Sequence, residues 1–129
     1  MSRHFPTSRI WLGLPWTAWM PLMAAHPLAL AQLPSGSGLY RIRFAGRDGE
    51  ILWLGWAESG VRETVERLSR QVHLPVEPYD DPRAPAHLLW TMRRKTRVSF
   101  EVSGLEIDPL DHPAIDQMLL EARQDIGLH

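Results

Sequence analysis

The sequence predicts an α+β domain with a small three-stranded mixed or antiparallel β-sheet flanked by three helices, preceded by an apolar N-terminal arm. Three short segments have strand-like patterns and three longer ones repeat apolar residues at helical spacing, in the order β-β-α-α-β-α. The chain has 129 residues and is 44% hydrophobic, which suffices for one core but not for two ordinary domains. We therefore expect an arm over residues 1–32 and one domain over residues 33–129.

The N-terminal arm has a basic start and an apolar stretch over Ile10–Leu30. This composition is similar to that of a secretory signal, and Ala29–Ala31 offers small residues for cleavage. However, Pro15, Pro21 and Pro27 interrupt the stretch and would break a continuous helix. The uninterrupted apolar runs are also far shorter than the roughly 20 residues that span a membrane. We expect the arm to pack on the domain, with a cleaved signal of a small secreted domain as the alternative.

A β-hairpin is expected at the start of the domain. Leu39–Phe44 alternates in a strand-like way, which places Tyr40 on the same face as the other even-numbered residues. Residues 46–49 form a turn, and Glu50–Leu54 is an almost continuous apolar strand that we expect to be covered on both faces. The third strand is Val98–Val102, which alternates strictly.

Three helices follow from apolar spacing and capping residues. Ser59 is the expected N-cap of the first, Ala84–Arg94 is the second, and Asp111 is the expected N-cap of the last, with Pro113 in its first turn. The residues that we expect to be buried are Val61, Val65 and Leu68 of the first helix, Leu119 of the last helix and Phe100 of the third strand.

Three short motifs stand at defined places in this order of elements. Gly38-Leu39-Tyr40 opens the hairpin, and Trp53-Leu54-Gly55 closes its second strand. Asp116–Leu120 places an acidic residue ahead of two leucines on the last helix. The motifs resemble the Gly-Ile-Tyr, Tyr-Ile-Gly and Glu-x-x-Leu-Ile elements of the GIY-YIG nuclease superfamily. The resemblance covers residues 33–126.

This resemblance implies a metal-dependent endonuclease that hydrolyses phosphodiester bonds of DNA, usually with Mg²⁺. The Tyr40 hydroxyl would help to activate a water molecule, and the Asp116 carboxylate would bind the metal. An arginine of the first helix would stabilise the phosphate. Arg62 is nearest to the expected distance from Gly55, whereas Arg67 precedes a core leucine as the family arginine precedes its own apolar residue. Both arginines are therefore candidates.

The second tripeptide departs from the family pattern. Trp53 stands at the position of a catalytic tyrosine, and an indole offers only an N–H donor, which cannot act as a base. His73 is an alternative base, because the pKa of an unperturbed histidine is about 6.5. Two functions stay open: an active endonuclease, and a catalytically degenerate domain that binds nucleic acid or a protein partner without cutting.

A basic segment joins the second helix to the third strand. Arg93, Arg94, Lys95 and Arg97 place four cations within five residues, which suits binding to phosphates, most simply those of DNA. The alternative is a solvated helix end. Arg41 and Arg43, on one face of the hairpin, are a candidate extension of this surface. A formal net charge of −1 argues against a uniformly basic surface.

The chain contains no cysteine. This excludes disulfides, thiolate metal sites and a cysteine nucleophile, and it is compatible with a reducing compartment. We therefore expect a cytoplasmic protein that does not enter a membrane. The sequence leaves the oligomeric state open.

Overall fold

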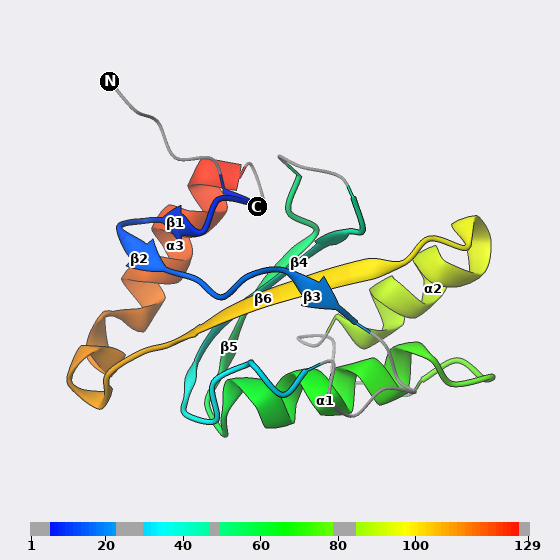
Figure 1. Cartoon of the computed structure of the whole chain (residues 1–129), viewed down its shortest axis with the longest axis horizontal. Coiled ribbons are helices and arrows are strands. Elements are labelled where there is room, and N and C mark those ends of the chain that lie inside the picture. The colour runs from blue at the N-terminus through cyan, green and yellow to red at the C-terminus, as the bar shows by residue number, and fades with distance from the viewer. Residues whose placement is uncertain (1–5, 23–29, 47–49, 79–84, 127–129) are drawn as a thin grey trace.

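The structure, a computed structural model, describes residues 6–22, 30–46, 50–78 and 85–126. The described residues confirm the α+β class, with three α-helices and two small antiparallel sheets (Figure 1). The elements are β1 (Ile10–Trp11), β2 (Leu14–Pro15), β3 (Met20–Pro21), β4 (Gly38–Phe44), β5 (Trp53–Ala57), α1 (Val61–Val72), α2 (Ala86–Thr96), β6 (Phe100–Glu106), a 3-10 helix (Pro109–Ala114) and α3 (Ile115–Ile126).

The main sheet has four strands in the order β3-β6-β4-β5, and all neighbours are antiparallel. The prediction of three strands was therefore one strand short. The additional strand comes from the N-terminal segment, where Met20 pairs with Val102 and Pro21 pairs with Glu101. A strand of only two residues, one of them a proline, gives too short a pattern to be recognised in an apolar stretch. Strands β1 and β2 form a separate two-stranded sheet.

The predicted hairpin is present as β4 and β5, but its second strand lies further along the chain. The ladder pairs Ile42 with Trp53 and Tyr40 with Gly55, and β5 continues to Ala57. Ile51 is buried although it precedes the ladder, which explains why its apolar character suggested an earlier start. Strand β6 likewise begins and ends later than predicted.

Helix α1 begins at Val61, and its N-cap is Gly60 with φ 122° rather than Ser59. A side-chain cap is not needed, because the preceding loop accepts hydrogen bonds from the first helical amides. The Val61 amide donates to the Gly36 carbonyl at 3.0 Å, and the Arg62 amide donates to the Pro34 carbonyl at 3.0 Å. The start of α1 is thereby fixed to the loop that leads into β4.

The other two helices also differ from prediction at their ends. Helix α2 extends to Thr96, and its C-cap, Arg97, adopts the left-handed conformation with φ 54°. The expected first residue of this helix, Ala84, lies outside the described residues. Asp108, not Asp111, is the cap before α3, because its carboxylate accepts a hydrogen bond from the Leu110 amide and starts the 3-10 helix.

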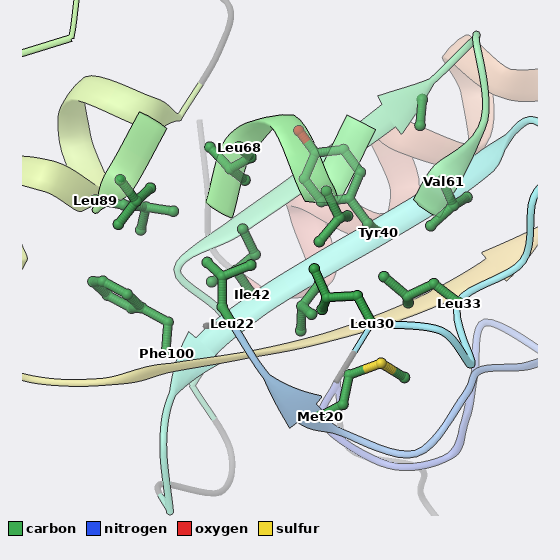
Figure 2. Close-up of a cluster of buried hydrophobic side chains, with 14 of the residues drawn as sticks. Met20, Leu22, Leu30, Leu33, Tyr40, Ile42, Val61, Leu68, Leu89 and Phe100 are labelled. Carbon is green, nitrogen blue, oxygen red and sulfur yellow. The ribbon is translucent and has the colours of Figure 1, made fainter. Parts of the chain in front are cut away.

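Two apolar clusters cover the two faces of the main sheet. The alternation of β4 directs Tyr40 and Ile42 to the face that carries α1 and α2, and it directs Leu39 and Arg41 to the face that carries β1, β2 and α3. Figure 2 shows Tyr40 among the aliphatic side chains of the first cluster. The expected burial is confirmed for Val61, Val65, Leu68 and Phe100, whereas Leu119 is only half-buried.

The N-terminal segment is hydrogen-bonded to β6. The Thr17 amide donates to the Gly104 carbonyl at 2.8 Å, and the Thr17 hydroxyl accepts from the Gly104 amide at 3.0 Å. The Ser103 hydroxyl donates to the Thr17 carbonyl at 2.7 Å. Trp11 and Trp16 are almost fully buried in the second cluster. These contacts place residues 6–22 against the sheet as part of its packed structure.

Candidate functional site

Tyr40 lies in the centre of the main sheet, with a glycine opposite it on each neighbouring strand. Its partners in the ladders are Gly55 of β5 and Gly104 of β6. The Tyr40 ring leans across Gly55, so that a Cβ atom at position 55 would lie 2.5 to 2.6 Å from three atoms at the outer end of the tyrosine side chain. Val61 and Leu33 occupy the corresponding space over Gly104. Packing therefore accounts for the tyrosine and for both glycines.

The environment of Tyr40 does not prepare its hydroxyl to act as a base. Only 5% of the residue is exposed, and burial raises the pKa of the hydroxyl above its usual value of 10.0. The nearby Trp53 side chain offsets part of this rise in pKa. The buried Trp53 N–H nevertheless makes no hydrogen bond of normal geometry. A catalytic tyrosine would need its pKa lowered towards neutrality, so the shift has the wrong direction.

The two candidate arginines of α1 have separate roles. The Arg62 side chain turns back along the helix start and donates from Nε to the Leu33 carbonyl at 3.0 Å. Arg67 is exposed and forms an ion pair of 3.4 Å with Glu63, one turn earlier on the same helix. An exposed pair of this kind contributes little to stability. Arg62 thus holds the loop before β4, and Arg67 lies in solvent.

Asp116 lies on the other side of the sheet from Tyr40. It is exposed in the first turn of α3, and that helix packs on the face opposite α1 through Ile115 and Ala122. No group of three His, Cys, Asp or Glu side chains within the described ranges is arranged to bind a metal ion. Tyr40 and Asp116 are thus separated by the sheet.

His73 is also engaged in a local contact. One of its ring nitrogens lies 2.7 Å from the Ser69 carbonyl, one turn back along α1, and the residue is the C-cap of that helix. A histidine at a helix C-terminus is favourable for the macrodipole without any catalytic role.

The basic segment is exposed along its whole length. Arg93, Arg94 and Lys95 occupy the last turn of α2, and Arg97 follows as its C-cap. Within the part of the chain that the structure describes, none of these four residues forms an ion pair with a carboxylate. The four cations therefore lie exposed at the end of one helix, without a carboxylate partner among the described residues.

Arg41 does not extend this surface, contrary to the prediction. It is fully buried, and its guanidinium lies 4.6 Å from the ring centres of both Trp16 and Trp19. Its Nη atoms donate to the Pro6 and Ser8 carbonyls of the N-terminal segment. Burial, with a smaller contribution from neighbouring Arg43, lowers the pKa of Arg41 to about 9, so that the group stays protonated at neutral pH.

Arg43 is only slightly exposed. Its Nε donates to Glu101 at 3.0 Å, and its guanidinium lies 4.2 Å from the ring centre of Trp19. The tryptophan-rich arm thus covers both hairpin arginines. Sequence reasoning missed this contact, although three tryptophans in a segment facing two arginines on one strand face were the available signal.

A second contact between a tryptophan and an arginine lies on α2. The Arg94 guanidinium lies 5.0 Å from the ring centre of Trp90, one turn earlier on the helix. The Trp90 N–H donates to the Leu74 carbonyl at 3.0 Å, and Arg94 donates to the Pro75 carbonyl at 3.3 Å. The linker that follows α1, residues 74–78, therefore fixes both side chains at the edge of the basic segment.

The chain matches no protein-family model, no curated protein and no solved structure. Among the described residues, no helix has the length and apolar character needed to cross a membrane.

Proposed function

We propose that this domain binds DNA without cutting it, through the basic segment Arg93–Arg97 at the end of α2. The observation that carries the proposal is the exposed set of four cations, unpaired among the described residues, at the end of a helix anchored in the core by Leu89. Phosphates are the partners that such a cluster suits best, because each bound cation releases counterions from the DNA.

The distribution of charge over the molecule supports an oriented contact with a polyanion. Strand β6 runs from the basic segment to the 3-10 helix, so the two lie at opposite ends of that strand (Figure 1). At the far end the exposed side chains include Glu106, Asp108 and Asp111. A protein with one basic and one acidic end turns its basic end towards DNA even when its net charge is close to zero.

The separation of the nuclease-like residues favours binding over hydrolysis. Tyr40 is buried on one face of the sheet, and Asp116 is exposed on the side of the other. Hydrolysis would need the base, the phosphate-binding arginine and the metal ligand around one phosphate. Binding without hydrolysis does not require these groups to lie close together.

The test of binding is fluorescence anisotropy with a labelled DNA oligonucleotide over a range of salt concentrations. Arg93→Ala/Lys95→Ala should weaken binding and reduce the slope of log affinity against log salt by about one per lost phosphate contact. The control is Arg67→Ala/Arg70→Ala, which removes the same charge from exposed positions of α1 and should leave affinity nearly unchanged. Equal effects of both double variants would refute the proposed surface.

The test of hydrolysis is incubation of the same DNA with the protein and Mg²⁺. We expect no cleavage. Cleavage that is abolished by both Tyr40→Phe and Asp116→Asn would refute the non-cutting proposal and would establish the nuclease alternative.

A further inference from the structure

The linker after α1 packs against Trp90 and Arg94 of α2, beside the basic segment. Binding of phosphates needs only the positive charges of that segment, and this aromatic and apolar surface is additional to them. Leu74 is 41% exposed and Val76 is 65% exposed, so two apolar side chains of this linker face solvent. Leu74 and Pro75 bind Trp90 and Arg94 through their carbonyls. Leu74 and Pro75 therefore lie beside the indole and the guanidinium, at the edge of the basic segment.

The Trp90 and Arg94 side chains form a pre-organised stack. Both planar groups have a hydrogen bond to the linker backbone, so neither must be ordered when a ligand arrives. Arg94 is exposed although it lies over the indole. A guanidinium held in this way offers a flat cationic surface on which another planar group stacks.

We propose that this surface receives single-stranded DNA, with one unpaired base on the Trp90–Arg94 stack and the neighbouring phosphates on the basic segment. The inference rests on the proposed DNA binding. A duplex keeps its bases paired and stacked on each other, and it offers phosphates but no free base to this surface. A single strand exposes the faces of its bases, and stacking on aromatic side chains and arginine is the usual means of holding them.

The test compares three DNA probes of equal length: an oligothymidine strand, a duplex, and a strand of abasic residues that retains the phosphates. The full chain should bind the oligothymidine roughly tenfold or more tightly than either of the other two, because only this probe presents unpaired bases. This comparison uses the unmodified protein and does not depend on how a variant folds.

Arg94→Lys gives the matching test on the protein. It keeps the positive charge but loses the planar group, so affinity for oligothymidine should fall by at least about fivefold while the salt dependence is unchanged. The control is Arg70→Lys, at an exposed position of α1, which should leave binding of every probe unchanged. Circular dichroism of both variants verifies that helix content is retained.

The outcomes separate the inference from the proposed function on which it rests. Failure of the protein to bind any of the three probes would overturn both. Binding of the abasic strand or the duplex as tightly as oligothymidine would overturn base stacking and leave DNA binding intact. Loss of oligothymidine affinity in Arg94→Lys, with a retained salt slope, would support the stack.

Discussion

Replacing Gly55 by alanine tests whether packing explains the glycine and the tyrosine that resemble the nuclease motif. The new Cβ would lie 2.5 to 2.6 Å from Cζ, Cε1 and the hydroxyl oxygen of Tyr40, whereas ordinary contacts begin at about 3.4 Å. The tyrosine would therefore have to move by roughly 1 Å inside a close-packed cluster. Overpacking of this size costs about 1–3 kcal/mol of unfolding free energy. A loss of about 2 kcal/mol would lower Tm by roughly 8 °C in a domain of this size.

The assay is urea denaturation of four proteins: the unmodified chain, Gly55→Ala, Tyr40→Leu and the double variant. Leucine lacks the outer ring atoms and the hydroxyl, so alanine at position 55 should cost little or nothing in the Tyr40→Leu background. The coupling energy between the two sites should therefore be about 1–3 kcal/mol. An equal cost of Gly55→Ala in both backgrounds, or no cost in the unmodified chain, would refute the reasoning.

Two further predictions concern backbone strain and pH. Arg97→Gly should raise the unfolding free energy by about 1 kcal/mol, because φ is 54° and glycine adopts this conformation without a steric penalty; it should also reduce the salt slope of DNA binding, and unchanged binding would remove Arg97 from the interface. Burial raises the pKa of Tyr40, so above pH 10.0 the unfolded chain loses this proton first and stability falls as the pH rises. The measurement is the unfolding free energy at pH 9 and pH 11, obtained by urea denaturation. Tyr40→Phe should lose less stability between these two pH values than the unmodified chain, and an identical loss in both proteins would contradict the assignment.

Periodicity predicted the elements well where one side of an element is buried. The alternation in Leu39–Phe44 correctly separated the two faces of β4, and the spacing of Val61, Val65 and Leu68 correctly gave the buried side of α1. Capping was predicted less well. The first amides of α1 donate hydrogen bonds to loop carbonyls that lie about 25 residues earlier in the chain. Such distant acceptors cannot be predicted from the residues around the helix start.

The candidate site depended on long-range placement, which the motifs did not determine. Tyr40 and Asp116 were assigned to one site only through the resemblance to the nuclease family. The structure places them on opposite sides of the sheet, because α3 packs on the face opposite α1 through Ile115 and Ala122. The basic segment was easier to predict, because its residues are adjacent in sequence and charged side chains are usually exposed. Trp90 and Arg94 are four residues apart on the predicted second helix, so their contact could have been expected, whereas their hydrogen bonds to the linker carbonyls have no sequence signal.

The pairing of β3 with β6 has a consequence for the order of folding during synthesis. Met20 emerges from the ribosome early, whereas its partner Val102 emerges only after most of the chain has been made. Until then the tryptophans of the N-terminal segment have no completed sheet on which to pack. We expect the hairpin and α1, whose contacts are closer in sequence, to form first, and the segment to dock late. On this order of folding, the tryptophans of the segment stay uncovered until β6 has been made.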